Sequence, residues 1–124
     1  LAKTTDSPAV LVSHGPPRQT HKNGIDVVSE GDNRGDPRLT QAIQKAKILF
    51  GIFGNIHEAG GKGTTLDGTQ IVKPGEFADS LFLNPGPVDS VRWKMNDGSE
   101  SVGMGAILTI KGTQAAYEVK RMGS

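Results

Sequence analysis

Apolar residues form two uninterrupted runs in the first half of the chain, at residues 9–12 and 48–53. An apolar run without alternation is typical of a strand that is covered on both faces of a sheet. Polar residues and glycines follow both runs, beginning at Ser13 and at Gly54. The pattern therefore predicts two buried strands, each followed directly by a polar turn.

One segment between the two runs has the pattern of an amphipathic helix, at residues 36–47. Asp36 suits the N-cap position and Pro37 suits the first helical position. Apolar residues recur there at steps of three and four, namely Leu39, Ala42, Ile43 and Ala46. Two lysines, Lys45 and Lys47, lie near its end, where their positive charge interacts favourably with the negative end of the helix dipole. The first part of the chain is thus predicted to be strand, helix, strand.

A histidine follows each predicted strand, His14 after the first and His57 after the second. Strands joined by a crossover helix are parallel in nearly all cases, so both histidines should lie at the sheet edge where α/β proteins bind ligands. This placement predicts a metal or phosphate site. Neutral imidazole suits Zn, Mn, Fe or Ni, and Glu58 could orient a ring. A structural role for both histidines stays open, because a lone histidine at a strand end is often hydrogen-bonded rather than a ligand.

The chain is rich in strand patterns after residue 65. The predicted strands are residues 69–72, 80–83, 90–95, 106–110 and 115–119. Turn residues between the last two predict a hairpin. Val91, Trp93 and Met95 alternate with other residues, which predicts one buried face and a core position for Trp93 rather than ligand stacking.

Three motifs follow one another in a fixed order. They read Val-Leu-Val-Ser-His-Gly-Pro-Pro at residues 10–17, Phe-Gly-Asn-Ile-His-Glu-Ala-Gly-Gly at residues 53–61 and Leu-Asn-Pro-Gly at residues 83–86. Together they resemble the carboxyl-terminal half of a calcineurin-like metallophosphoesterase, in the branch whose last metal motif reads Phe-Gly-x-Ile-His-Glu. The resemblance implies an α/β fold that forms the carboxyl-terminal half of a layered αββα sandwich.

The resemblance also implies a site for two divalent metal ions, Mn, Fe or Zn, and hydrolysis of a phosphoester, with a phosphodiester as the expected substrate. His14 would bind the second metal and His57 the first. The family's usual last motif is Gly-His-x-His, so Asn55 stands where a histidine is expected, and its amide oxygen is a weaker ligand. Asn84 would shape the loop beside the site. The resemblance assigns no catalytic acid or base in this chain.

The motifs of the family's amino-terminal half are missing from the 124 residues, since no Asp-x-His, Gly-Asp-x-x-Asp or Gly-Asn-His sequence occurs. Residues 1–124 are therefore expected to form a single partial domain, and a fragment, a processed product and one of two chains all stay open. A second chain or a swapped protomer would supply the missing half, without which the sheet is expected to expose a large apolar face. The alternative is a non-catalytic binding or assembly module on a degenerate scaffold, which Asn55 favours.

Two polar loops border the predicted site. Residues 18–24 include Arg18 and His21, which could contact a phosphate, although a solvated basic loop is the preferred interpretation. Residues 60–65 have the composition of a phosphate-binding loop but not its spacing, because Gly63 follows Lys62 where serine or threonine is required. A flexible loop is predicted there.

Composition changes this picture little. With 14 basic and 13 acidic residues, the chain lacks the excess charge that nucleic acids or anionic membranes attract, so neither is an expected partner. The 17 glycines and 7 prolines indicate much loop. No cysteine is present and no apolar stretch reaches the roughly 18 residues that span a bilayer, so a cytoplasmic location is expected.

Overall fold

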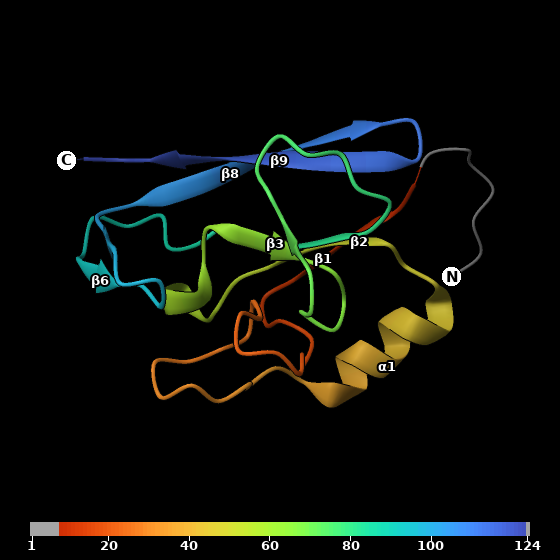
Figure 1. Ribbon diagram of the computed structural model, residues 1–124, viewed down its shortest axis with the longest axis horizontal. Coiled ribbons are helices and arrows are strands. Elements are labelled where there is room, and N and C mark those ends of the chain that lie inside the picture. The colour runs from red at the N-terminus through yellow and green to blue at the C-terminus, as the bar shows by residue number, and fades with distance from the viewer. Residues whose placement is uncertain (1–7, 124) are drawn as a thin grey trace.

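The computed structural model describes residues 8–123, which form an α/β arrangement built on a mixed five-stranded sheet (Figure 1). The strand order is β1-β2-β5-β3-β4. The strands are β1 Val10–Ser13, β2 Phe50–Phe53, β3 Lys62–Thr64, β4 Ile71–Val72 and β5 Leu81–Asn84. The α/β class predicted from the sequence is therefore confirmed.

The three longer strands of the sheet are parallel. Strand β2 pairs with β1 on one side and with β5 on the other, both in parallel register, whereas β3 is antiparallel to β5 and β4 to β3. The prediction that the first two strands are parallel is confirmed. Because β1, β2 and β5 run in one direction, the residues that follow them lie at one edge of the sheet.

The predicted helix is also confirmed, as α1 Pro37–Ala46. The side chain of Asp36 caps its first turn by accepting a hydrogen bond of 2.8 Å from the backbone of Arg38. Lys47 ends the helix in the left-handed conformation, with φ of 55°. Ile43 is buried against the sheet and Leu39 packs beside it, whereas Ala42 and Ala46 are exposed, so the predicted apolar stripe is confirmed for two of its four residues.

Each face of the sheet has its own apolar cluster. Side chains alternate along a strand, so Leu81 and Leu83 of β5 face one cluster while Phe82 faces the other. The first cluster consists of Phe50, Val72, Leu81, Leu83, Ala115 and Tyr117. The second consists of Ile25, Ile43, Phe53 and Phe82.

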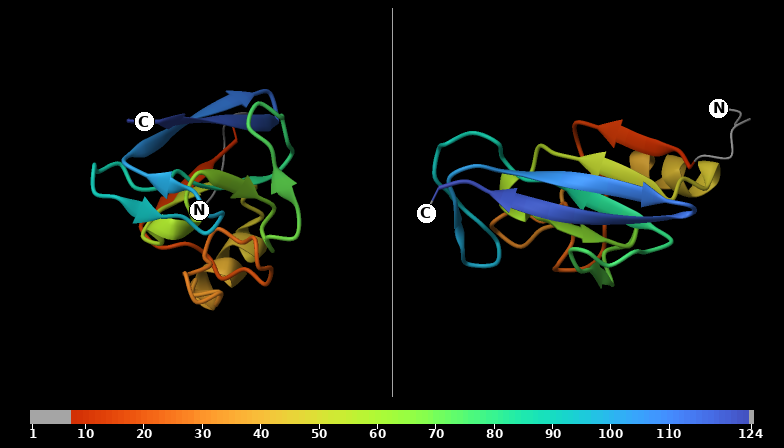
Figure 2. Two further views of the ribbon diagram at one scale, coloured as in Figure 1. Left: turned by 60° about the vertical axis from the view of Figure 1, so that its left-hand side comes forward. Right: turned by 90° about the horizontal axis from the view of Figure 1, so that it is seen from above.

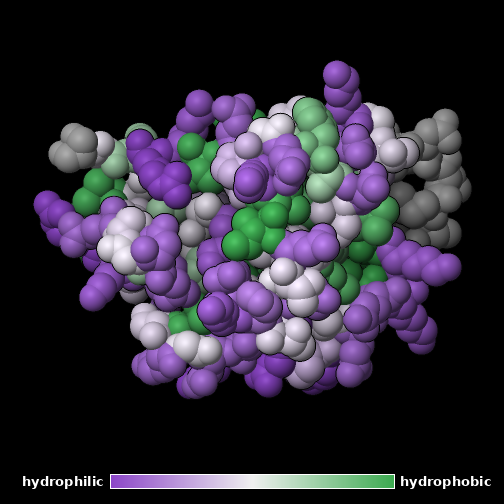
Figure 3. Space-filling view, viewed as in Figure 1, coloured by the Kyte–Doolittle hydropathy of each residue, from purple (hydrophilic) through white to green (hydrophobic). Residues whose placement is uncertain are grey.

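A long hairpin covers the face of the sheet opposite α1 (Figures 1 and 2). Its strands, β8 Met104–Lys111 and β9 Gln114–Arg121, pair along their whole length. The predicted hairpin is therefore confirmed, and the expectation that the sheet exposes a large apolar face is wrong, because β8 and β9 supply the covering layer. On the side of the molecule seen in Figure 3, polar side chains surround a small apolar patch.

Strand β1 differs from its sequence-based prediction. It is an edge strand of the sheet, and Val12 is 71% exposed. The uninterrupted apolar run predicted a strand covered on both faces, and this prediction is wrong for β1, none of whose four residues is fully buried, because β1 lies at the edge of the sheet and pairs with β2 alone.

Two further segments differ from prediction because they form short strands. Residues 62–64 are strand β3 rather than part of a flexible loop, since they pair with both β5 and β4. The predicted strand at 90–95 shortens to β6 Trp93–Lys94, which pairs with β7 Glu100–Ser101. Met95 is buried as predicted, whereas Val91 is exposed.

The segment between β1 and α1 is anchored to the sheet rather than solvated. Gln19 is buried, and its amide nitrogen donates to Thr64 Oγ1 and to the carbonyls of Thr65 and Leu66 at 2.9–3.0 Å. Asp26 is fully buried beside it. The interpretation of residues 18–24 as a solvated loop therefore holds for exposed side chains such as Lys22 but is wrong for Gln19.

Candidate functional site

His14 lies directly after β1 and is exposed. Its carbonyl oxygen accepts a hydrogen bond of 2.9 Å from Gly54 N, which joins the turn after β1 to the turn after β2. Its ring nitrogen Nε2 lies 3.0 Å from Asn55 Oδ1. The parallel strands thus bring together two of the predicted site residues that are 41 positions apart.

Asn55 makes the sharp bend that leads from β2 to His57. Its φ is 67°, in the left-handed region that asparagine tolerates better than most residues. The backbone of Ile56 donates to the carbonyl of Gly54 at 2.7 Å and closes the bend. His57 then begins the short 3₁₀ helix η1 His57–Ala59.

The ring of His57 is held without a hydrogen bond at Nδ1. This nitrogen is buried and has no partner among the described residues. Glu58, expected as a partner for a ring, instead accepts hydrogen bonds from the backbone and the hydroxyl of Ser29 at 3.1 and 3.2 Å. The ring of His57 packs against Trp93 instead, with centroids 4.5 Å apart.

Asn84 is the last residue of β5 and so lies at the same edge of the sheet, where it is buried. Its amide nitrogen donates to the carbonyls of Ile25 and Ile56 at 3.1 and 2.9 Å, and its amide oxygen accepts from Gly86 N at 3.0 Å. Asn84 therefore joins the turn before His57 to the loop after β5 through three side-chain hydrogen bonds, each made to a backbone group.

A cavity of about 300 Å³ lies between these turns. Its lining residues are Gly54, Asn55, His57, Asn84, Gly86, Pro87, Val88 and Asp89. Asp89 is the one carboxylate among them, and no lysine or arginine lines the cavity. Sequence reasoning missed Asp89, because it lies in an irregular loop whose course no periodicity predicts.

Gly60, which follows η1, lies close to Gly86, which lines the cavity. A Cβ atom on Gly60 would lie 2.2 Å from the Cα atom of Gly86. Only glycine at position 60 therefore lets the chain after η1 pass the loop that carries Asp89.

Arg18 and His21 lie away from this cavity. Arg18 Nε donates to the carbonyl of Gly35 at 3.0 Å, and its side chain lines a separate surface pocket with residues of α1. His21 Nδ1 accepts from the backbone of Asn23 at 3.2 Å. Neither residue is among those that line the cavity beside His57.

Two charged groups with shifted pKa values, Lys62 and Asp97, are not among the residues that line the cavity. Burial lowers the pKa of Lys62, and the opposing attraction of Asp97 is smaller. Hydrogen bonds from Ser99 lower the pKa of Asp97. The positive charges of Arg121 and Lys62 lower it further. Lys62 Nζ donates to the carbonyl of Asn23 at 3.2 Å. This lysine therefore has a structural contact and does not reach into the lining of the cavity.

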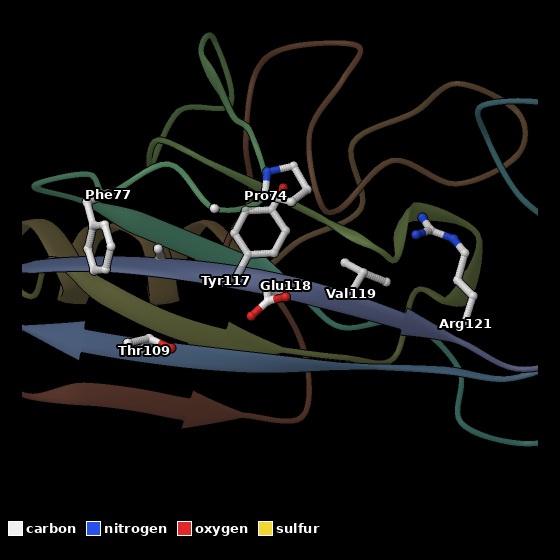
Figure 4. A pocket seen from close by; sticks show the side chains of 9 residues that line it. Pro74, Phe77, Thr109, Tyr117, Glu118, Val119 and Arg121 are labelled. Carbon is white, nitrogen blue, oxygen red and sulfur yellow. The ribbon is translucent and has the colours of Figure 1, made fainter.

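A larger surface cavity, of about 580 Å³, lies along β9. Figure 4 shows Pro74 and Phe77 on one side of it and Tyr117, Val119 and Arg121 along the strand. It contains none of the residues that the sequence singled out as site candidates.

The donors at this edge suit part of a divalent metal site. Two imidazoles and an amide oxygen, from His14, His57 and Asn55, are ligand types that Mn, Fe and Zn accept. Within residues 8–123, however, no three His, Cys, Asp or Glu side chains come together as a group that could hold a metal ion. The ligand chemistry fits, and the number of ligands from this chain is too small for a complete site.

Comparison with protein-family models, with curated proteins and with solved structures finds no match for this chain. The fold and the site define an α/β protein in which His14 contacts Asn55 at the carboxyl edge of the parallel strands, while His57 lines the neighbouring cavity. Among residues 8–123, no helix is long and apolar enough to cross a membrane.

Proposed function

We propose that this chain supplies part of a two-metal site that hydrolyses phosphoesters, with a phosphodiester as the substrate. The main support is the buried Nδ1 of His57, which has no partner within residues 8–123, in a cavity that Asn55, the partner of His14, also lines. Buried polar atoms without a partner are rare in folded proteins, so each one needs an explanation. A role for His57 in ligand binding supplies that explanation.

The spacing of the other two donors is consistent with a shared ion. Ligand atoms about 2.1 Å from one ion lie about 3 Å apart when the angle between them is near 90°. His14 Nε2 and Asn55 Oδ1 are 3.0 Å apart as a hydrogen bond in which Nε2 donates, so Nε2 would have to give up this hydrogen before both atoms could bind one ion. We therefore assign these two side chains to the second metal and His57 to the first. The ions would supply positive charge for the phosphate and activate water for attack.

The charge of the cavity favours a phosphodiester over a phosphomonoester. Asp89 is the only charged side chain in the lining. A monoester carries nearly two negative charges at neutral pH and a diester carries one, so the diester meets less repulsion from Asp89. Pro87 and Val88 offer apolar contacts to an organic ester group.

The remaining ligands would come from a second chain or a swapped protomer. Strand β1 is the open edge of the sheet and is followed directly by His14. A partner strand added parallel to β1 would end beside His14, so acidic residues after that strand would enter the site. The exposed side chain of Val12 lies on this edge strand.

A non-catalytic binding module is the second candidate. The amide of Asn55 in place of the expected imidazole favours it, as does the lack of a three-residue acidic or histidine group in the described part of the chain. The two candidates differ in their need for metal, because hydrolysis by the proposed site requires it.

Replacing His57 or His14 by alanine is expected to weaken Mn²⁺ binding by more than about tenfold, because each variant loses a ligand from a small donor set. Isothermal titration calorimetry measures the affinity. His21→Ala is the matched control, because His21 is the one remaining histidine of the sequence and is not among the residues that line the cavity. Equal affinities in all four proteins would contradict the proposed site.

Turnover is measured with bis(p-nitrophenyl) phosphate and Mn²⁺. We expect no turnover from this chain alone and turnover after addition of the amino-terminal half of a calcineurin-like metallophosphoesterase as a separate polypeptide. Turnover by the chain alone that is lost in His57→Ala would contradict the need for a partner. Metal binding without turnover in every mixture would favour the binding module.

Asn55→His is expected to tighten Mn²⁺ binding by about tenfold, because an imidazole replaces a weaker neutral amide ligand. Histidine is, like asparagine, enriched at positive φ, so the bend at 67° is retained. Asn55→Gly is the matched control, because glycine accepts the same φ and offers no ligand. An Asn55→His variant that binds Mn²⁺ no better than Asn55→Gly would contradict the assignment of Asn55 to a metal.

A further inference from the structure

The short hairpin of β6 and β7 is fixed onto the turn that carries His57. The backbone of Asn96 donates to the carbonyl of Glu58 at 2.9 Å, and its amide nitrogen donates to the carbonyl of Val27 at 2.7 Å. These bonds join the hairpin both to η1 and to the segment that precedes α1. Trp93, in β6, is therefore held directly against His57.

The contact between the two rings is an edge-to-face packing. The planes of His57 and Trp93 are 81° apart and their centroids are 4.5 Å apart, a favourable geometry for aromatic rings. Neither His57 Nδ1 nor Trp93 Nε1 has a hydrogen-bond partner among the described residues, although both atoms are buried. Packing rather than hydrogen bonding therefore sets the orientation of the imidazole.

This arrangement is unusual for a histidine that binds metal. With Nδ1 as the proposed ligand atom, the second ring nitrogen is Nε2, and in a histidine that binds metal this second nitrogen almost always donates to a carboxylate, a carbonyl or water, which fixes the ring. The nearest carboxylate in sequence, Glu58, is occupied by Ser29. Trp93 also belongs to neither apolar cluster of the sheet, so its contact with His57 is separate from the packing of the core.

We propose that Trp93 is a positioning residue, whose indole replaces the usual hydrogen bond and holds the imidazole of His57 in the orientation that binds metal. This inference rests on the proposed metal site. It assigns a role to the one tryptophan of the chain, which the sequence pattern placed in the core. Loss of the indole frees the ring to rotate about its χ2 angle and so reduces the fraction of molecules that are ready to bind.

The test compares Trp93→Leu and Trp93→Phe with the unchanged chain by Co²⁺ titration. Trp93→Leu is expected to weaken Co²⁺ binding by about tenfold and to shift the visible d–d bands, as loss of an outer residue that orients a ligand does. Trp93→Phe keeps an aromatic ring against His57 and is expected to bind Co²⁺ within about threefold of the unchanged chain. Thermal unfolding without metal controls for stability.

The outcomes separate the inference from the proposed function. Failure of the unchanged chain to bind Co²⁺, both alone and with the amino-terminal half added, contradicts the metal site itself. Binding that depends on His57 but is equal in Trp93→Leu, with the same d–d bands, contradicts the role of Trp93 alone. If Trp93→Leu does not fold, the unchanged chain still gives a test: Co²⁺ should quench the fluorescence of its single tryptophan, while Zn²⁺ should not. Absence of this quenching at saturating Co²⁺ contradicts contact between Trp93 and a metal-binding His57.

Discussion

Asp26→Ala is expected to lower the free energy of unfolding by about 3–5 kcal/mol, because it leaves several buried donors without an acceptor. The carboxylate of Asp26 is fully buried. It accepts hydrogen bonds of 2.9 Å from the backbone of Gln19 and of Gly35, and one of 2.7 Å from Asn33 Nδ2. Urea unfolding followed by circular dichroism measures the change.

Asp32→Ala provides the control for Asp26→Ala. Asp32 lies in the same segment, but its side chain is 63% exposed and pairs with the exposed Arg34. Its loss is expected to change the free energy of unfolding by less than about 0.5 kcal/mol. Similar unfolding midpoints for Asp26→Ala and the unchanged chain would show that the 18–36 segment does not depend on this carboxylate.

The buried carboxylate also shows where sequence reasoning about the fold stopped. The segment around Asp26 is polar and rich in glycine, which favours a solvated loop in any reading of local pattern. Its order depends on contacts distant in sequence, such as Gln19 with Thr64, and no local periodicity encodes them. By contrast, α1 and the β8–β9 hairpin carry their signals locally, in the cap at Asp36 and in the turn residues between the two strands, and both were predicted.

Short strands were missed for a related reason. Strand β3 has three residues and β7 has two, so neither is long enough to show a period. Each exists because a neighbouring strand supplies hydrogen bonds, as β5 does for β3. The exposure of Val12 is likewise a property of the position of β1 in the sheet, which the apolar run does not specify.

The candidate site also combines features that local sequence predicts with features that depend on distant parts of the chain. Topology predicted that His14 and the turn before His57 would meet, because parallel strands end at one edge, and their contact follows from that. The positions of Trp93 and Asp89 depend on how irregular loops fold back over the edge. Local sequence therefore predicted the candidate residues that follow strands, while the residues that surround them required the three-dimensional structure.

Tyr117→Ala is expected to lower the free energy of unfolding by about 3–5 kcal/mol, because it removes a large ring from the core between the hairpin and the sheet. Tyr117 is buried, with Phe50 and Leu83 in the same cluster. Its hydroxyl donates to the carbonyl of Val72 at 2.6 Å and accepts from Gly63 N at 3.2 Å. The same unfolding measurement gives the magnitude, and a loss below 1 kcal/mol would contradict a core position for the ring.

Tyr117→Phe removes the hydroxyl and keeps the ring. It is expected to lower the free energy of unfolding by about 1–2 kcal/mol at neutral pH, because both backbone partners lose a hydrogen bond.

Burial raises the pKa of Tyr117 in the folded chain above the value of about 10 in the unfolded chain. The folded state thus retains its proton longer, so this contribution to stability is complete below pH 10 and is lost as the pH rises through the folded pKa. The stability difference between the unchanged chain and Tyr117→Phe should therefore shrink above pH 10. Since Lys62 titrates in both proteins, the difference isolates the tyrosine, and absorbance at 295 nm follows the only tyrosine of the chain directly. A difference that stays constant through the titration of this tyrosine would show that its hydroxyl is not buried in the folded state.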